Sequence, residues 1–221
     1  MLTAGQDPSR ASFGLVLLHG RGAGARDIIG LGEALALPDL AFAAPEAPGR
    51  SWWRTSFLAP AAQMEPSVQR GMAQVAAAVT EFEAAGLPRN RIGLLGFSQG
   101  SCLAAEYLAR RGAGLGFGFI LSGGLVGTAD ASSAADPALY GYPDKLFDYA
   151  SNLSGLSLYA SCHENDPHIP LKRFLDSAAE FRRLGAEVTD RTVPGAGHGI
   201  DDQDIAAVRA ALNTAPERKA M

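Results

Sequence analysis

The sequence predicts an α/β fold, a mostly parallel sheet covered by helices on both faces. Apolar runs of strand length alternate with helical patterns along the whole chain. Most of these strands are continuous apolar runs, such as residues 15–18 and 117–121, which is typical of strands buried on both faces. The carboxyl ends of parallel strands meet at one edge of such a sheet, where sites in these folds lie.

The individual elements follow from apolar periodicity and from Gly and Pro punctuation. We expect strands at 13–18, 40–44, 92–97, 116–121, 156–161 and 187–193, and helices at 26–37, 67–85, 99–111, 171–184 and 202–212. The stretch 45–66 is expected to be irregular. Within the long loop 122–155 only 143–151 has a helical pattern, and the polar tail 213–221 is expected to fray.

Length and charge limit the classes of protein to which this chain can belong. The 221 residues predict a single domain, 1–221, and the net charge of -4 without basic clusters argues against nucleic acid or stable membrane partners. No apolar run approaches the ~20 residues that cross a bilayer, and the first ten residues lack an export signal. We therefore expect a cytoplasmic monomer or homodimer, with Cys102 and Cys162 as buried free thiols.

One stretch contains a candidate nucleophile. The apolar run 92–97 leads into Gly96-Phe97-Ser98-Gln99-Gly100, and a helical pattern follows directly. Gly-x-Ser-x-Gly is typical of a nucleophile elbow, a sharp strand-to-helix turn that projects the serine hydroxyl outward. The motif alone is weak in a chain with 26 glycines, so the flanking strand and helix favour the elbow over an ordinary βα turn.

A serine nucleophile needs a histidine to take its proton and an acid to orient that histidine. Proteins with this elbow have these groups in the order Ser, Asp or Glu, His. Asp166 and His198 each follow a later strand, so we expect both at the same sheet edge as Ser98. Glu164 shares a loop with Asp166 and is the main alternative acid. Weaker alternatives are Asp136, Asp144 and Asp201.

The negative oxygen of a tetrahedral intermediate needs two preorganised N–H donors. The backbone N–H of Gln99, at the start of a helix, is expected to be one, and the glycine-rich turn 19–25 is expected to supply the other. His19 is expected to brace that turn rather than to transfer protons.

No cofactor and no metal are expected. The histidines beside Asp166 lack a third ligand at suitable spacing. The stretch Gly20-Arg21-Gly22-Ala23-Gly24-Ala25 also fits the dinucleotide fingerprint Gly-x-Gly-x-x-Ala. The acid that would hold a ribose, Glu46, comes a few residues late, and a dinucleotide site would leave Ser98 and His198 without a role.

Five motifs together resemble the phospholipase/carboxylesterase family of α/β-hydrolases, in particular its bacterial carboxylesterase branch and acyl-protein thioesterase relatives. They are His19-Gly20-Arg21-Gly22, Ser56-Phe57-Leu58-Ala59-Pro60, Gly96-Phe97-Ser98-Gln99-Gly100, Asp166-Pro167-His168-Ile169-Pro170 and Gly195-Ala196-Gly197-His198.

This resemblance covers nearly the whole chain. It implies the α/β-hydrolase fold with its leading antiparallel strands trimmed. It further implies a triad of Ser98, Asp166 and His198, and an oxyanion hole formed by the backbone N–H groups of Arg21 and Gln99. Thioesterase members commonly have Leu after His-Gly, where this chain has Arg21.

Apolar side chains near this sheet edge are candidates for the substrate pocket. They are Trp52, Trp53, Phe57, Leu58, Leu125 and Val126. The same side chains are equally consistent with a buried core beneath a long loop. Because the region where related folds insert a lid has little helical pattern, we expect a compact domain with a minimal lid.

We therefore expect a serine carboxylesterase that hydrolyses small, short- to medium-chain carboxylic esters through an acyl-enzyme. Thioesterase activity of the acyl-protein thioesterase type, or lysophospholipase activity, is the alternative among enzymes. A non-catalytic ligand-binding protein on a hydrolase scaffold is the alternative of another class, although a pure binder has no need of all three catalytic groups.

Overall fold

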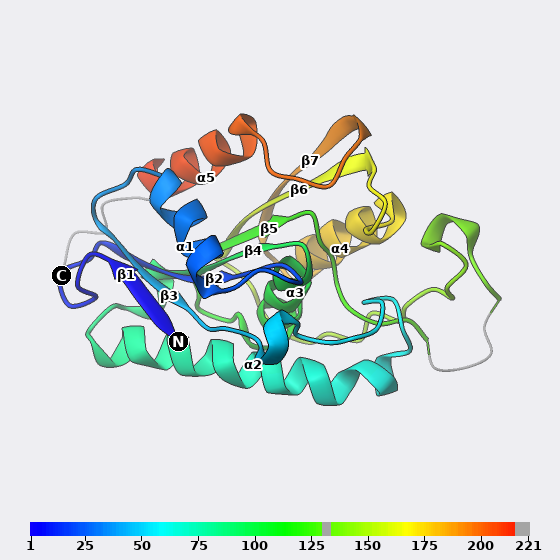
Figure 1. Cartoon of the computed structure of the whole chain (residues 1–221), viewed down its shortest axis with the longest axis horizontal. Helices are drawn as coiled ribbons and strands as arrows, with labels where there is room; N and C mark the ends of the chain where they lie inside the picture. Colours follow the sequence, from blue (N-terminus) through cyan, green and yellow to red (C-terminus); the bar gives the residue numbers. More distant parts are fainter. Residues whose placement is uncertain (130–133, 215–221) are drawn as a thin grey trace.

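A single sheet runs through the middle of the molecule (Figure 1). Within residues 1–129 and 134–214, which this computed structural model describes, seven strands pair in the order β1-β3-β2-β4-β5-β6-β7. The pairs from β3 to β7 are parallel, and β1 pairs antiparallel with β3. The strands are β1 (Leu2–Gly5), β2 (Phe13–Leu18), β3 (Leu40–Ala44), β4 (Ile92–Phe97), β5 (Phe117–Leu121), β6 (Ser157–Asn165) and β7 (Glu187–Ala196).

Helices cover both faces of this sheet (Figure 1). On one face lie α1 (Ala25–Ala34) and α5 (Asp202–Thr214), and on the other lie α2 (Ala61–Ala84), α3 (Gln99–Arg111) and α4 (Leu171–Arg183). Successive side chains of a strand point to opposite faces. Accordingly Leu15 and Leu17 of β2 pack in the apolar cluster that contains α1 and α5, while Val16 and Leu18 pack in the cluster of α2, α3 and α4. The predicted mostly parallel, two-sided sheet is confirmed.

Two elements depart from the sequence prediction near the N-terminal half of the chain. Strand β1, only four residues long, was not predicted; it adds one antiparallel strand at the sheet edge. Helix α2 begins at Ala61 rather than at 67, with Pro66 inside it. The prediction of an irregular stretch up to Pro66 is wrong because the first turn closes at Pro60. The Pro60 carbonyl accepts the N–H groups of Gln63 and Met64.

The helix predicted at 143–151 is not formed. Short 3-10 turns occur at Pro48–Arg50, Arg89–Arg91 and Pro137–Leu139, but 143–151 has no helical hydrogen bonding. Contacts with distant elements hold this segment instead: the Ala129 N–H donates to the Asp144 carbonyl at 2.9 Å, and Lys172 pairs with the Asp144 side chain at 2.7 Å. These tertiary contacts outweigh the weak local helical preference.

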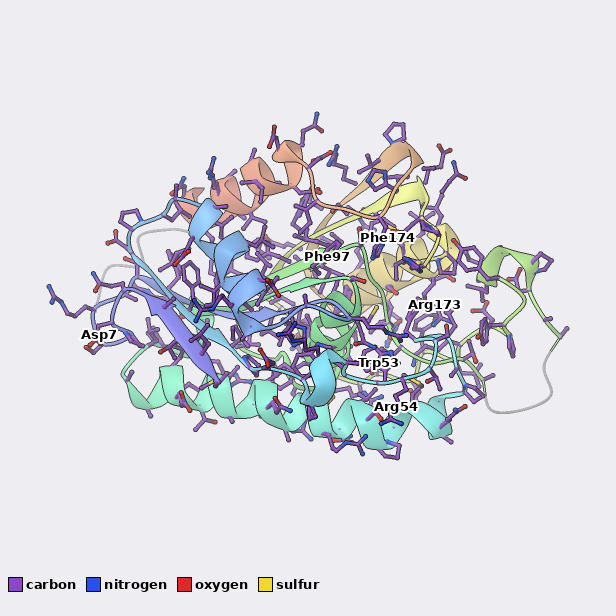
Figure 2. The ribbon with its side chains drawn as sticks, viewed as in Figure 1. Asp7, Trp53, Arg54, Phe97, Arg173 and Phe174 are labelled. Carbon is purple, nitrogen blue, oxygen red and sulfur yellow. The ribbon has the colours of Figure 1, made fainter. Side chains whose placement is uncertain are left out.

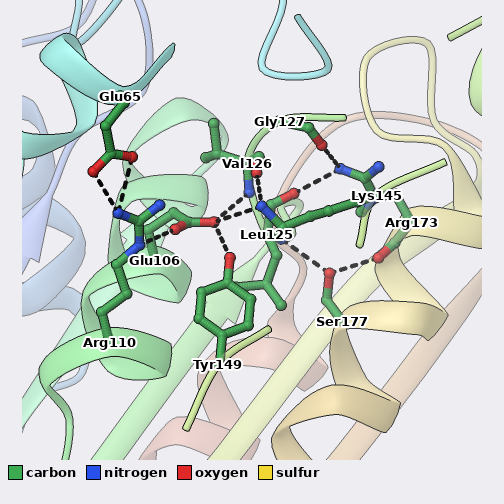
Figure 3. Close-up of polar contacts among 10 residues, drawn as sticks. All are labelled: Glu65, Glu106, Arg110, Leu125, Val126, Gly127, Lys145, Tyr149, Arg173 and Ser177. Carbon is green, nitrogen blue, oxygen red and sulfur yellow. Dashed lines mark hydrogen bonds and ion pairs between the residues drawn. The ribbon is translucent and has the colours of Figure 1, made fainter. Parts of the chain in front are cut away.

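Glu106 anchors the long loop that follows β5 (Figure 3). This carboxylate on α3 is fully buried and accepts hydrogen bonds from Arg110 Nε at 2.7 Å, the Val126 N–H at 2.8 Å and the Tyr149 hydroxyl at 2.6 Å. Lys145 Nζ lies 3.7 Å from it. A buried charge is tolerated when it is paired and hydrogen-bonded in this way. The cluster therefore ties both ends of the loop to α3.

None of the helices that the structure describes is both long enough and apolar enough to span a bilayer.

Candidate active site

Ser98 lies at the turn between β4 and α3 with φ 55° and ψ -120°. A non-glycine residue in this conformation is strained, and such strain concentrates at functional sites. The flanking glycines are required by close backbone approach. A Cβ on Gly96 would lie 2.5 Å from the Gly100 carbonyl oxygen, and one on Gly100 would lie 2.1 Å from the Leu18 carbonyl oxygen. The sequence Gly-x-Ser-x-Gly thus folds into the tight turn that it predicts.

Three side chains from separate loops meet at this turn. His198 Nε2 lies 2.8 Å from Ser98 Oγ, and His198 Nδ1 lies 2.7 Å from Asp166 Oδ2. Asp166 follows β6 and His198 follows β7, so both residues come from the carboxyl ends of strands on the same edge as Ser98. The structure therefore brings together the three residues that the sequence selected.

Asp166 is buried and held on several sides. Its Oδ1 accepts the backbone N–H groups of His168 at 2.8 Å and Ile169 at 3.0 Å. Burial opposes ionisation and is the largest single effect. The hydrogen bonds from His198 and from these two N–H groups together outweigh it, and the pKa of Asp166 is lowered. The carboxylate is therefore charged at neutral pH and can only accept hydrogen bonds.

The alternative acids lie elsewhere. Glu164 is exposed, and its carboxylate accepts the Gly195 N–H at 3.3 Å rather than contacting His198. Asp136 accepts the Ala138 N–H of a 3-10 turn, and Asp144 pairs with Lys172. Asp201 accepts the N–H groups of residues 203 and 204 at the start of α5, which makes it the cap of that helix.

The turn after β2 lies against the nucleophile. A Cβ on Gly20 would be 3.3 Å from Ser98 Cβ, so the backbone next to Arg21 runs directly beside the serine. No hydrogen bond within the described part of the chain uses the N–H of Arg21 or of Gln99. Both groups flank Ser98, and both are available to a substrate oxygen.

His19 braces this turn. Its Nε2 accepts the Ala47 N–H at 3.1 Å, and its Nδ1 lies 2.8 Å from the Gly20 carbonyl oxygen. Because an N–H only donates and a carbonyl only accepts, these partners assign the neutral tautomer with the proton on Nδ1. Trp52 packs on this ring at 5.2 Å and donates its indole N–H to the His19 carbonyl at 3.0 Å. Both ring nitrogens are engaged, as expected for a structural histidine.

In the glycine-rich turn, carboxylates of the chain itself bind the N–H groups that a dinucleotide phosphate would need. Such phosphates bind the free N–H groups at a helix N-terminus. Here the Ala25 N–H donates to the Glu46 carboxylate at 2.9 Å, and the Gly24 N–H donates to Asp27 at 2.7 Å. Two carboxylates of the chain therefore occupy the donors of α1, and this geometry opposes a dinucleotide site.

The side chains of Arg21 and Gln99 converge on one backbone carbonyl, that of Trp53. Gln99 Nε2 donates to it at 2.7 Å, Ser51 Oγ donates at 2.6 Å, and Arg21 Nη2 lies at 3.4 Å. Gln99 Oε1 in turn accepts the Trp52 N–H at 2.9 Å. These contacts fix the loop 51–55 between the two turns that flank Ser98.

A cavity of about 630 Å³ opens beside Ser98 and His198. Of the predicted pocket residues, Trp53, Phe57 and Leu58 line it. Trp52, Leu125 and Val126 do not: Trp52 packs on His19, and Leu125 and Val126 are buried beside Arg173 and Glu106. In Figure 2, Phe97 lies near the middle of the molecule, and Trp53 lies in the segment between the sheet and α2.

Further residues that line the cavity were not predicted. Tyr140 and Tyr142 reach it from the long loop, and Phe97, Pro167, His168 and Ile169 also line it. The Tyr140 hydroxyl donates to the Asp166 carbonyl. Pro167, His168 and Ile169 directly follow the acid in the sequence, and this position is a local signal that they lie near the site. No local pattern marks the two tyrosines, because only the path of the loop brings them here.

The two cysteines are free and buried, as expected. Cys102 lines the cavity one turn after Ser98, and burial raises its pKa to about 12. Burial and the nearby Asp166 raise the pKa of Cys162, which lies 3.8 Å from the carboxylate. Neither thiol is a thiolate nucleophile at neutral pH. Within residues 1–129 and 134–214, no three His, Cys, Asp or Glu side chains gather as a metal site would require.

Comparisons with known proteins show which family the chain is similar to. A model of the phospholipase/carboxylesterase family matches residues 4–215. The crystal structure of a phospholipase/carboxylesterase from Dyadobacter fermentans is 33% identical, with a TM-score of 0.84 over 96% of this chain and 95% of that chain. No curated protein sequence matches the chain significantly.

More distant structures share the fold alone. A carboxylesterase from Mesorhizobium loti is 22% identical, with a TM-score of 0.66 over 92% of this chain and 90% of that one. SOBER1 from Arabidopsis thaliana is 18% identical, with a TM-score of 0.70 over 91% and 97%. Because the family model spans most of the sequence and the Dyadobacter structure superposes over nearly all of it, this chain belongs to the phospholipase/carboxylesterase family of hydrolases and has the α/β-hydrolase fold.

Proposed function

We propose that the chain is a serine carboxylesterase that hydrolyses small, short- to medium-chain carboxylic esters through an acyl-enzyme. The observation that supports it most is the continuous chain of contacts from Ser98 Oγ through His198 to Asp166, at 2.8 and 2.7 Å. Hydrogen-bond distances between nucleophile and base, and between base and acid, are the geometric signature of this chemistry.

The protonation states follow from the partners. Asp166 is ionised and only accepts, so His198 Nδ1 carries a proton and donates it to Oδ2. His198 Nε2 is then the acceptor for the Ser98 hydroxyl proton. This tautomer is the one that a general base requires, and Asp166 stabilises the imidazolium that forms when the proton moves.

The reaction then has two halves. Ser98 Oγ forms a bond to the ester carbonyl carbon while its proton moves to His198 Nε2, and the N–H groups of Arg21 and Gln99 stabilise the oxyanion. The alkoxy oxygen leaves with the proton from His198, which gives an alcohol and an acyl-serine. His198 next takes a proton from water as the hydroxide adds to the acyl carbon. When the bond from that carbon to Ser98 Oγ breaks, His198 returns the proton to Oγ, which releases the carboxylic acid and restores the free serine.

The form of the cavity supports small substrates. Apart from the 3-10 turn Pro137–Leu139, the described part of the loop 122–156 contains no helix to form a lid. The cavity of about 630 Å³ has an aromatic wall that includes Trp53 and Phe57, which suits a short acyl or alcohol group. With p-nitrophenyl esters we expect rates to be highest for short acyl chains, without activation at a lipid interface. A maximum at long chains would contradict this preference.

Covalent labelling tests the nucleophile directly. A fluorophosphonate should form one adduct with the intact protein, and mass spectrometry should locate it on Ser98. Ser98→Ala should abolish labelling and reduce turnover by about 10⁶-fold without altering the fold. Ser101→Ala is the matched control, because Ser101 is buried in α3 and does not line the cavity. It should keep the label.

Two outcomes of this experiment would contradict the proposed function or its nucleophile. A ligand-binding protein on the same scaffold would remain unlabelled and would hydrolyse no ester. Near-normal turnover in Ser98→Ala would remove Ser98 as the nucleophile. Thioester hydrolysis would follow the same chemical steps, so matched oxygen esters and thioesters, compared by kcat/KM, decide which linkage the protein prefers.

A further inference from the structure

We infer that Arg21 and Trp53 form a subsite for a carboxylate in the cavity, and that the preferred substrates are esters that carry a second, anionic group. The inference rests on the proposed esterase function and specifies its substrate class. Arg21 and Trp53 line the cavity that contains the nucleophile, and each has N–H groups with no acceptor among the described residues.

The Arg21 guanidinium is held in place without an ion pair. Its Nη2 donates to the Thr55 carbonyl at 2.6 Å and lies 3.4 Å from the Trp53 carbonyl. In the described part of the chain it contacts no carboxylate, although the whole sequence has a net charge of -4. An arginine has five N–H donors, so those on Nε and Nη1 remain for a ligand. A guanidinium fixed by carbonyls offers a preorganised fork to a carboxylate.

Trp53 supplies the second donor. Trp53 is 4% exposed and lines the cavity, and its indole Nε1–H has no acceptor among the described residues. A buried donor without a partner is costly and is uncommon in native proteins. The neighbouring tryptophan shows the contrast, because Trp52 Nε1 donates to the His19 carbonyl. A substrate oxygen in the cavity would satisfy the Trp53 N–H.

The charges around the cavity favour an anion. None of the described residues that line it is Asp or Glu. Asp166 lies behind His198, which it binds. A second cavity shares Tyr140 and Pro167 with this one. The carboxylates Glu164, Asp166 and Asp176 line that second cavity together with Lys172, and Arg21 does not. A cation that faces a cavity without carboxylates attracts anionic ligands and orients them.

Two pairs of isosteric esters test the inference. The first is monomethyl glutarate against methyl glutaramate, in which an uncharged amide replaces the carboxylate on the acyl side. The second is acetoxyacetate against acetoxyacetamide, with the same exchange on the alcohol side. The measured quantity is the selectivity ratio, which is kcat/KM for the anionic ester divided by kcat/KM for the neutral one. We expect at least one pair to give a ratio of about ten.

The variants separate ligand binding from loop bracing. Arg21→Leu should lower the selectivity ratio about tenfold, Arg21→Lys should restore part of it, and Trp53→Phe, which lacks the N–H, should lower it about threefold. Arg54→Leu is the matched control, because Arg54 is exposed nearby but does not line the cavity. It should change the ratio by less than about twofold. Added salt should reduce the wild-type ratio.

Two results would overturn the inference while the proposed function stands. One is hydrolysis of the neutral esters as fast as the anionic ones. The other is a loss in Arg21→Leu that affects both esters of a pair equally, since an arginine that only braces the loop 53–55 changes both rates together. If no ester is hydrolysed and Ser98 is not labelled, the proposed function itself fails.

Discussion

Asp166, and not the nearby Glu164, is the acid that contacts His198. Asp166 and Glu164 lie two positions apart: Glu164 is in the last part of β6, and Asp166 directly follows that strand. Only Asp166 is buried and only Asp166 contacts His198, while Glu164 is exposed and bonds to the Gly195 N–H. β6 continues to Asn165 with a register shift between His163 and Asn165. The position of each carboxylate therefore depends on this local irregularity in the sheet.

The contrast gives a paired mutational test. Asp166→Asn should lower kcat by about 10⁴-fold, because the amide no longer fixes the tautomer of His198 or stabilises the imidazolium. Glu164→Gln should leave kcat within about twofold, since the one side-chain hydrogen bond of Glu164 among the described residues is exposed. Steady-state kinetics on one p-nitrophenyl ester are sufficient. Equal losses in the two variants would mean that the acid has been assigned incorrectly.

The lowered pKa of Asp166 predicts how stability depends on pH. The unfolded chain holds this proton more tightly than the folded chain, so the stabilisation is complete above about pH 4 and is lost as the pH falls through the folded pKa. We expect the difference in free energy of unfolding between wild type and Asp166→Asn to shrink below about pH 4. Urea titrations from pH 7 to pH 3 measure it. A difference that grows on acidification would contradict the assigned direction.

At the scale of elements, the elbow joins three pieces of backbone. Gly100, in the first turn of α3, lies against the end of β2, where a Cβ would meet the carbonyl oxygens of Leu18 and His19 at 2.1 and 2.6 Å. Neither carbonyl can move freely, since both belong to the strand and turn beside Ser98. The approach of α3 to β2 thus depends on the absence of a side chain.

Two glycine substitutions should therefore act in opposite directions. Gly100→Ala should destabilise the protein by roughly 3 kcal/mol, the upper part of the range for overpacking, and should displace Ser98. Gly30→Ala, at an exposed position of helix α1 with no atom within 4 Å of the added Cβ, should stabilise it by about 0.5–1 kcal/mol. Urea unfolding of both variants checks the signs. A neutral Gly100→Ala would show that the turn relaxes easily.

At the scale of the whole molecule, one buried carboxylate connects elements that are far apart in sequence. Glu106 on α3 binds Val126 at the start of the long loop and Tyr149 near its end. Burial and the Glu106 charge raise the pKa of Tyr149, so its hydroxyl keeps its proton and donates. The same loop also brings Tyr140 and Tyr142 to the cavity, so the loop must be held for the site to be complete.

Removal of this carboxylate should be costly. Glu106→Ala leaves Arg110 and Lys145 without their buried partner and should destabilise the protein by roughly 3–5 kcal/mol. Glu83→Ala is the control, because it breaks an exposed pair with Arg89 and should cost less than about 1 kcal/mol. Chemical denaturation compares the two. A small loss in Glu106→Ala would mean that the loop is held mainly by apolar packing.

Elements that are encoded by local patterns were predicted accurately, whereas elements that depend on contacts with distant segments were not. Strands β2, β3 and β4 and helix α3 were predicted to the residue, because apolar runs and glycine turns encode them locally. The antiparallel strand β1 was missed, because four partly exposed residues have no pattern until β3 pairs with them. The helix expected at 143–151 failed for a related reason, since Asp144 and Lys145 are held by partners outside the segment.

By itself the sequence determined the layered parallel sheet, the elbow at Ser98, and the order in which an acid and a histidine follow it. These features are set by local periodicity and by backbone conformations open to few residues. Only the tertiary structure decided that Asp166 rather than Glu164 meets His198, that Trp53 and not Trp52 faces the cavity, and that two tyrosines of a distant loop line it. The physical reason is that neighbours in sequence point to different sides, and which side is buried depends on contacts between distant segments.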